Sequence, residues 1–467
     1  MTDVVDLAIV GGGPAGMAAA DVATGAGLTV AIVDEQQRLG GQILRQPPAT
    51  FRVGNWLPGR AYGAVKAQLA RAEALPMRVL TGQSVHSAYR NDDGFDLMLA
   101  GPRGASMLRA RRLLVATGCY DMPVAFPGWT LPGATSAGAV QAFVKAQQIV
   151  PGERFVLAGT HPLQLILADQ IVKAGGTVSA ILFAQTPARG AALLRAPGVA
   201  MAHAGTLAAA TGAMARLARA GVPVRFGRIV VAAEGGESVT AVRVAKVAGG
   251  GPGPVVEVIA CDSVATCYGF LPQSDLPRAL GADAIPIAGT GGWRIRHDEW
   301  MRASVPGLYV AGEVTGVAGA EVSMLEGVIA GLGIATDSGS IESGDAVRRA
   351  GPTRRRLRSA RRFADMLAAT ADPRPFWPHL ADDGTVICRC EDILRGTLAD
   401  AIAGNPDAGP NAIKRLTRTG MGRCQGRGCE HQLRAMMPPS RPQGAFEPRM
   451  PVRPTPIGAI ADAKTQS

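Results

Sequence analysis

The feature that most constrains the fold is a glycine-rich turn near the N-terminus, flanked by an apolar run on each side of an Ala-rich segment. Val4–Val10 has the length and apolarity of a buried strand, Met17–Ala26 suits a helix, and Leu28–Val33 is a second apolar run. A strand, a turn, a helix and a strand in this order predict a βαβ unit of a parallel sheet. The chain is therefore expected to be an α/β protein.

The turn itself has the spacing of a dinucleotide-binding fingerprint. Gly13 lets the backbone approach a pyrophosphate, Gly16 allows close packing of the helix on the strand, and the helix N-terminus offers unpaired N–H groups to phosphate. Asp34 closes the second strand, where an acidic group accepts hydrogen bonds from ribose hydroxyls. The residues expected to line this cradle are Gly11, Gly13, Pro14, Ala15, Gly16, Asp34 and Glu35.

Three further segments favour FAD over a pyridine nucleotide. They are the turn Gly40–Ile43, the apolar run Leu114–Gly118 that ends in Thr-Gly, and the run Leu308–Glu313 that ends in Gly and an acid. In this order they resemble the glutathione-reductase-like flavoprotein superfamily over about residues 1–340. The resemblance implies a Rossmann-type body with two dinucleotide-binding domains. It also implies FAD contacts from Gly41, Gln42, Thr117, Gly118, Gly312 and Glu313, where Glu313 replaces the superfamily's usual Asp.

A second βαβ unit is predicted between residues 154 and 183, but its turn has lost the fingerprint. Only Gly159 remains, and Gln164 stands where the third glycine would fall. A Cβ atom at such positions obstructs the approach of a phosphate to the backbone. We therefore expect weak or absent pyridine-nucleotide binding, and we interpret His161 as a packed loop residue.

The redox dithiol of that superfamily is also missing. No Cys-x-x-Cys pair precedes the second turn, which argues against a disulfide reductase mechanism. The isolated residues Cys119, Cys261 and Cys267 are expected to be buried structural thiols. An antiparallel meander is predicted from Arg78–Gly82, Phe95–Ala100 and Met107–Ala110.

Two cysteine pairs near the C-terminus form a candidate metal site, and its four residues are Cys388, Cys390, Cys424 and Cys429. An all-cysteine set suits zinc or an iron–sulfur cluster. One intervening residue in the first pair is short for a zinc knuckle, although zinc and unconnected thiols stay as alternatives. The glycines around the second pair free N–H groups that can hydrogen-bond to cluster sulfur.

The two sequence motifs that contain these cysteines, CRCE and GMGRCQGRGC, resemble those of the bacterioferritin-associated-ferredoxin-like [2Fe–2S] domain. The whole chain resembles the α (A) subunits of octopine and nopaline oxidases, D-hydroxyproline dehydrogenase, dye-linked L-proline dehydrogenase and hydrogen cyanide synthase. This resemblance implies that a separate β subunit of the amino-acid-oxidase type, with its own FAD, oxidises the amine. The present chain would relay electrons and hold no catalytic residue. Further implied components are a small ferredoxin-like subunit, an FMN at a subunit interface, and a quinone acceptor.

Together these segments predict how the chain divides into domains. They predict an FAD-binding domain at 1–120 and 265–340, a second NAD(P)-like domain at 121–264, an Arg-rich helical linker at 341–379, a small α-rich [2Fe–2S] module at 380–437, and an extended Pro-rich tail at 438–467.

Composition narrows the remaining functional classes. The net charge is +11, but much of the excess lies between Arg348 and Arg362, and aromatic residues are only 4%, so a nucleic-acid partner is not expected. No signal peptide and no apolar run of about 18 residues is apparent, which predicts a cytoplasmic chain without a membrane span, held at the inner membrane only through partners. A self-sufficient NAD(P)H-dependent reductase and a scaffold with a structural cluster remain the competing hypotheses.

Overall fold

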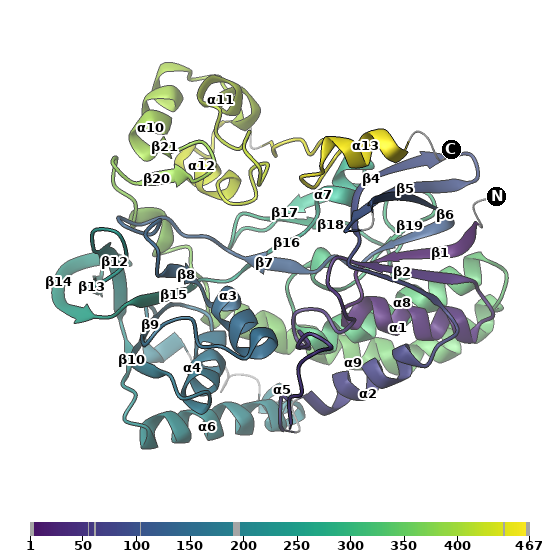
Figure 1. The fold of residues 1–467 in the computed structure, drawn as a ribbon, viewed down its shortest axis with the longest axis horizontal. Coiled ribbons are helices and arrows are strands. Elements are labelled where there is room, and N and C mark those ends of the chain that lie inside the picture. Colours follow the sequence, from purple (N-terminus) through teal and green to yellow (C-terminus); the bar gives the residue numbers. More distant parts are fainter. Residues whose placement is uncertain are drawn as a thin grey trace.

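The structure, a computed structural model, describes residues 4–54, 56–59, 62–102, 104–189, 197–441 and 444–463. Two α/β bodies lie side by side, a small helical module sits above one of them, and the C-terminal tail returns across the other (Figure 1). The predicted α/β class is confirmed. The few residues of the predicted domains and tail at 1–3, 55, 60–61, 103, 190–196, 442–443 and 464–467 lie outside the described ranges.

The first body is built on a seven-stranded sheet. Its order is β3-β2-β1-β6-β5-β4, with β19 also paired to β6. The strands are β1 (Val5–Val10), β2 (Val30–Asp34), β3 (Arg78–Thr81), β4 (Ser84–Asn91), β5 (Gly94–Gly101), β6 (Gly104–Val115) and β19 (Leu308–Val310). Strands β1 and β2 belong to the predicted first βαβ unit, and β6 also pairs with β1 in parallel, so the carboxyl ends of all three strands meet at one edge.

Four helices accompany this sheet. They are α1 (Pro14–Gly25), α2 (Gly63–Glu73), α8 (Ala320–Asp337) and α9 (Ser343–Thr370). Small residues let two of them, α1 and α8, approach each other closely. A Cβ atom on Gly327 of α8 would overlap the carbonyl oxygen of Ala15 in α1, and one on Gly331 would lie 2.7 Å from Val22. This contact fixes the N-terminus of α1 relative to the loop that follows β19.

The second body repeats the plan with a five-stranded parallel sheet of order β11-β10-β9-β15-β8. Its strands are β8 (Ala134–Ser136), β9 (Arg154–Gly159), β10 (Thr177–Phe183), β11 (Val224–Phe226) and β15 (Ser263–Cys267). Its helical segments are α3 (Ala137–Ala142), the π-helix η2 (Phe143–Gln147), α4 (Leu163–Lys173), α5 (Pro197–Ala202) and α6 (Ala204–Arg219). An antiparallel sheet of β12 (Arg228–Glu234), β13 (Ala241–Ala248) and β14 (Gly251–Ala260) flanks it.

Short ribbons connect the two bodies. They are β7 (Cys119–Asp121) with β16 (Phe270–Pro272), β17 (Ala284–Pro286) with β18 (Trp293–Ile295), α7 (Asp275–Ala279) and the 3-10 turn η4 (Gly312–Thr315). The β7–β16 ribbon leaves the carboxyl end of β6, so it runs from the first sheet towards the second body and passes below the module (Figure 1).

The predicted antiparallel meander needs a correction. Arg78–Gly82 corresponds to β3, which pairs in parallel with β2, and the antiparallel set is β4-β5-β6. Strand β4 was missed because its residues are mostly polar, and Arg111 and Arg112 divided the long strand β6 into two apparent pieces. The meander therefore lies one strand further along the chain.

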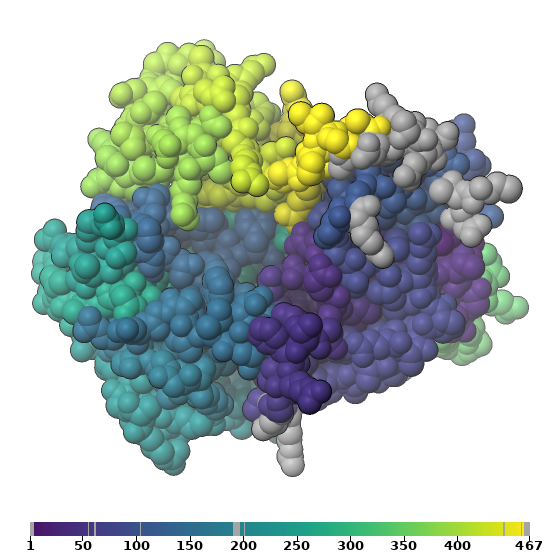
Figure 2. All heavy atoms as spheres, viewed as in Figure 1, coloured from purple at the N-terminus to yellow at the C-terminus, as the bar shows by residue number. Residues whose placement is uncertain are grey.

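The C-terminal module is mostly helical. It comprises η5 (Trp377–His379), β20 (Val386–Cys388), β21 (Ile393–Leu394), α10 (Arg395–Gly404), α11 (Pro410–Thr417) and α12 (Glu430–Met436). Its apolar residues, such as Leu398, Ile413 and Leu433, are continuous with the core of the second body. The module is therefore docked on that body, as the space-filling view in Figure 2 shows.

The tail differs in part from the extended chain that was predicted. The structure has irregular chain from 444 to 456, but Ile457–Ala463 form the short helix α13 beside the first body (Figure 1). Among the helices in the described ranges, none combines the length and the apolarity needed to cross a lipid bilayer.

Candidate functional site

The backbone geometry of the first turn requires glycine at two positions. Gly11 has φ +110°, and a Cβ atom there would overlap the carbonyl oxygen of Ala116 in the neighbouring chain segment. A Cβ atom on Gly16 would overlap the carbonyl oxygen of Gly11. The strand–turn–helix geometry thus needs these two glycines whether or not a ligand is bound.

Gly13 is different, because the protein itself leaves room for a side chain there. Its φ of −80° and ψ of −172° suit any residue, and a Cβ atom would meet only the Cα of Gly41, 3.8 Å away. The N–H groups of Gly13, Ala15 and Gly16 donate to no acceptor within the described residues. Open space in front of free N–H donors at the N-terminus of α1 fits a bound phosphate.

Asp34 and Glu35 have separate roles at the end of β2. The buried Asp34 carboxylate accepts the N–H of Gly12 at 2.6 Å and the N–H of Gln36 at 2.7 Å, and burial raises the pKa of this carboxyl. Asp34 therefore holds the turn in shape. Glu35 is exposed and forms an ion pair with Arg453 at 3.4 Å, so it is the carboxylate with room for a ribose hydroxyl.

The residues after β6 lie at the same sheet edge. Thr117 Oγ1 donates to the carbonyl of Gln273 at 2.6 Å, and the Gln273 N–H donates to the carbonyl of Gly118 at 2.9 Å. Gly118 has φ +75° and faces open space. Gly41 has φ +60° and approaches Gly13 from the loop after β2, and the side-chain oxygen of Gln42 accepts from Arg45 at 2.9 Å.

Gly312 and Glu313 follow β19 at this edge. The N–H of Gly312 donates to Glu326 at 2.8 Å. The Glu313 carboxylate accepts the N–H groups of Ala318 and Gly319 at 3.0 and 2.9 Å, and burial raises the pKa of Glu313 to about 7. Glu313 therefore stabilises the loop before α8. Its remaining lone pairs could still accept hydrogen bonds from a cofactor. Sequence reasoning missed Glu326, which is fully buried and pairs with Arg361.

The turn after β9 follows the same backbone course as the turn after β1, but its N–H groups are already hydrogen-bonded within the protein. The N–H groups of Thr160 and His161 both donate to the carbonyl of Cys267 at 3.0 Å. The N–H of Leu163 donates to His161 Nδ1 at 3.2 Å, and that of Gln164 donates to the His161 carbonyl at 3.3 Å. The side chains of Thr160 and Gln164 are fully buried in the turn.

His161 and the isolated cysteines are placed as packed residues. Burial lowers the pKa of His161 to about 4, and its ring meets Phe270 edge-on at 5.0 Å. Cys261 and Cys267 are buried, and Cys119 is half-buried. Burial raises the pKa of all three thiols, which are therefore protonated and unreactive at neutral pH.

The four cysteines of the module come together as two thiol pairs. Cys429 donates to Cys388, which lowers the pKa of the Cys388 thiol to about 6, and Cys390 and Cys424 form the other hydrogen-bonded pair. No group of three or more Cys, His, Asp or Glu side chains in the described ranges is gathered closely enough for one metal ion. The Cys429 thiol lies within electrostatic reach of the other three, so the two pairs are close together, and a set of four cysteines suits an iron–sulfur cluster or zinc.

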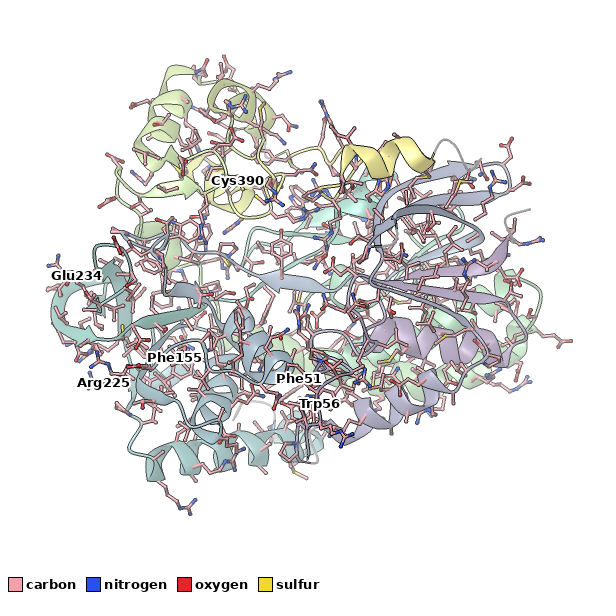
Figure 3. All side chains as sticks on the ribbon, in the orientation of Figure 1. Phe51, Trp56, Phe155, Arg225, Glu234 and Cys390 are labelled. Carbon is pink, nitrogen blue, oxygen red and sulfur yellow. The ribbon has the colours of Figure 1, made fainter. Side chains whose placement is uncertain are left out.

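The loop around Cys424 offers N–H groups to sulfur and packs against the tail. The N–H groups of Gly420 and Glu391 donate to Cys388, as expected for groups that stabilise a thiolate ligand. Gly420 and Gly426 have positive φ, and a Cβ atom on either would overlap the ring of Phe446 from the tail. Cys390 is exposed, and Figure 3 places it on the part of the module near the body.

Tyr120 lies between the site at the first glycine turn and the cysteine loop of the module. It follows Thr117 and Gly118 by only two or three residues, and its half-buried side chain is within electrostatic reach of Arg427 and Cys424. Three residues of extended strand span about 10 Å. The β7 ribbon therefore leads directly from the first nucleotide cradle to the cysteine loop.

Buried polar contacts fix the module on this ribbon. His431 Nε2 lies 2.7 Å from the carbonyl oxygen of Pro123, and Trp129 Nε1 donates to the carbonyl of Val386 at 2.7 Å. Trp293 Nε1 donates to Glu430 at 2.7 Å beside Cys429. The distance between the cradle and the cysteines is thus set by a rigid interface.

The fold and the site define a flavoprotein-type oxidoreductase with two dinucleotide-binding bodies and an added iron–sulfur module. Residues 5–339 match the pyridine nucleotide-disulphide oxidoreductase family model, and residues 386–438 match the BFD-like [2Fe-2S] binding domain. The chain is 31% identical to the opine oxidase A subunit of Agrobacterium tumefaciens, over 99% of this chain and 92% of that protein. It is 30% identical to the hydrogen cyanide synthase subunit HcnB of Pseudomonas protegens, over 97% and 96%.

The solved structure of L-proline dehydrogenase from P. horikoshii has the same fold, with a TM-score of 0.68, 19% identity, and coverage of 98% of this chain and 79% of that one. This chain belongs to the pyridine nucleotide-disulphide oxidoreductase family and, within it, to the group formed by the opine oxidase A subunits and HcnB. Its cofactors are FAD and a [2Fe–2S] cluster, as predicted.

Proposed function

We propose that this chain is the electron-transfer subunit of a heteromeric dehydrogenase or oxidase that acts on an amino acid or opine with a secondary amine. The relatives named above are subunits of larger enzymes, which supports a partner chain. We assign the oxidation of the amine to a β subunit of the amino-acid-oxidase type with its own FAD. A small ferredoxin-like subunit, an FMN at the subunit interface and a quinone acceptor complete the proposed route.

We assign the FAD of this chain to the first turn. The free N–H groups of Gly13, Ala15 and Gly16 would bind the pyrophosphate, and Glu35 would accept from a ribose hydroxyl. Gly41, Gln42, Thr117, Gly118, Gly312 and Glu313 border the same edge of the sheet. Pro14 starts the helix without needing a hydrogen-bond acceptor, and Asp34 holds Gly12 in place.

We assign the [2Fe–2S] cluster to Cys388, Cys390, Cys424 and Cys429, with each thiol pair on one iron. Flavin and cluster supply the redox chemistry when bound. The protein orients the two groups, shields Cys388 and Cys429 from water, and donates N–H groups to the ligand sulfur. No general base is needed for this role.

One observation carries the proposal: the segment from Thr117 to Tyr120 reaches from the nucleotide cradle to the cysteine loop. The second turn favours the relay over an NAD(P)H-dependent reductase, because its N–H donors are already bonded within the protein. We infer that this turn binds no pyridine nucleotide.

The relay is tested by reducing the flavin photochemically without oxygen and following the cluster by electron paramagnetic resonance. We expect the signal of a reduced [2Fe–2S] cluster in the wild-type chain and in Cys261→Ser, whose thiol is buried in the second body. Cys424→Ser should lose iron and acid-labile sulfide and keep its FAD. Rapid bleaching of the flavin by NADH or NADPH would favour the reductase, and a cluster that cannot be reduced would favour the scaffold.

A further inference from the structure

The end of the tail forms a connection between the cluster module and the first body. We call residues 450–453 the C-terminal strap. On the module side, Gln425 Nε2 donates to the carbonyl of Pro451 at 3.2 Å, and Arg427 donates to the carbonyl of Val452. On the body side, the N–H of Val452 donates to the carbonyl of His86 at 2.7 Å, and its side chain is buried in the core.

This anchoring places Arg453 at the carboxyl edge of the first sheet. Its Nη2 lies 2.6 Å from the side-chain oxygen of Gln273 and 3.4 Å from Glu35. Glu35 follows β2, and Gln273 is bonded to Thr117 and Gly118, which follow β6. Since β1 lies between β2 and β6 in the sheet, the guanidinium crosses the carboxyl end of β1, where the glycine turn begins.

The guanidinium of Arg453 has unused donors at this edge of the sheet. Its Nε and Nη1 make no hydrogen bond to the described part of the chain, and its side chain is 30% exposed. The free N–H groups of Gly13, Ala15 and Gly16 lie at the carboxyl end of β1, at the same edge of the sheet. A planar guanidinium matches the oxygens of a phosphate with two parallel hydrogen bonds, which a point charge does not do.

We propose that Arg453 binds the pyrophosphate of FAD from the side opposite the N-terminus of α1, so that the C-terminal tail completes the cofactor site. The inference rests on the proposed placement of FAD at the first turn. Because the strap is also bonded to Gln425 and Arg427, the cofactor site and the cluster loop share one short stretch of chain. In Figure 2 the tail lies along the top of the first body, beside the module.

The test compares Arg453→Ala with Arg449→Ala in the full-length chain. Arg449 is an exposed arginine of the same tail that makes no ion pair among the described residues, so it controls for the loss of one positive charge. We expect the dissociation constant of FAD from the reconstituted apoprotein to rise at least about tenfold in Arg453→Ala and less than about twofold in Arg449→Ala. Added salt should narrow this difference.

Two further measurements keep the inference falsifiable. If Arg453→Ala lowers only the unfolding temperature of the apoprotein and leaves the FAD affinity unchanged, Arg453 merely ties down the tail and the inference is overturned. If that variant does not fold, Arg453→Gln and Arg453→Lys replace it, and an unchanged FAD affinity in both has the same meaning. A Gly13→Val variant that retains FAD would instead overturn the placement of the cofactor.

Discussion

The two βαβ turns of this chain share one backbone design and differ in what their N–H groups bind. In the first turn, Gly13, Ala15 and Gly16 keep free N–H groups around an open space. In the second, the corresponding positions are His161, Leu163 and Gln164, and the N–H group of each is bonded inside the protein. The same backbone plan thus leaves N–H donors open in the first turn and bonds them within the protein in the second.

The comparison separates glycines needed for folding from those needed for a ligand. Gly11 and Gly159 occupy equivalent places, have φ of +110° and +150°, and press against the carbonyl oxygens of Ala116 and Cys267. Gly159 can therefore persist without any nucleotide. The end of β10 supports the same conclusion. Phe183 and Ala184 occupy the positions there that Asp34 and Glu35 occupy at the end of β2. The two carboxylates at the end of β2 therefore have no counterpart at the end of β10.

The largest effect is expected from Gly13→Val. The backbone at Gly13 tolerates a side chain, so the variant should fold normally while the valine occupies the space in front of the free N–H groups. We expect the dissociation constant of FAD to rise at least about 100-fold, which corresponds to about 2.7 kcal/mol. Flavin absorbance of the purified protein and titration of the apoprotein measure it.

The matched control for Gly13→Val is Thr160→Val in the second turn. Thr160 is fully buried, and valine has nearly its shape, so FAD content should stay at the wild-type level. Equal loss of FAD in both variants would mean that the two turns do not differ in the way proposed.

A smaller effect, this time on stability, is expected from Gly11→Ala and Gly159→Ala. Each new Cβ atom would overlap a backbone carbonyl oxygen in a conformation that L-residues rarely adopt. We expect each substitution to cost about 1–2 kcal/mol of unfolding free energy. Thermal unfolding of the two variants measures this cost. A Gly159→Ala variant as stable as the wild type would contradict the packing role of that glycine.

The sequence could predict the parts of the fold that depend on local pattern. The glycine turns, the buried strands β1, β2, β9 and β10, and the cysteine pairs all follow from residues close together in the chain. The polar strand β4 was missed, because part of its burial comes from the tail and not from its own pattern. Helix α9 runs through Pro352, and its Ala346, Ala350 and Phe363 are buried, which an Arg-rich composition obscures.

The parts of the site that depend on distant segments were not predictable. Arg453 meets Glu35 across more than 400 residues of sequence, and nothing in the tail marks it as a partner of the first turn. The contact of Phe446 with the cysteine loop was equally unpredictable from the sequence. Glu326 did leave a signal, since it is a carboxylate in the mostly apolar middle of α8, and such a residue needs buried partners. The division of roles between Asp34 and Glu35 required the hydrogen bonds themselves.

The smallest expected effect concerns how the stability of the second turn depends on pH. Burial lowers the pKa of His161 to about 4, and an unfolded histidine titrates near 6.5. The unfolded chain therefore binds the proton first as the pH falls, so the contribution of His161 to stability is present above pH 6.5 and is lost towards pH 4. Between pH 7 and pH 5.5 this amounts to about 1 kcal/mol.

The measurement is the unfolding temperature of the wild-type chain and of His161→Asn over this pH range. Asparagine can still accept from the N–H of Leu163 through its side-chain oxygen, but it does not titrate. The wild-type chain should lose more stability than the variant as the pH falls, because only its turn carries a buried neutral imidazole. An equal slope in both proteins would show that the second turn admits water and protons, and then it could also admit a nucleotide.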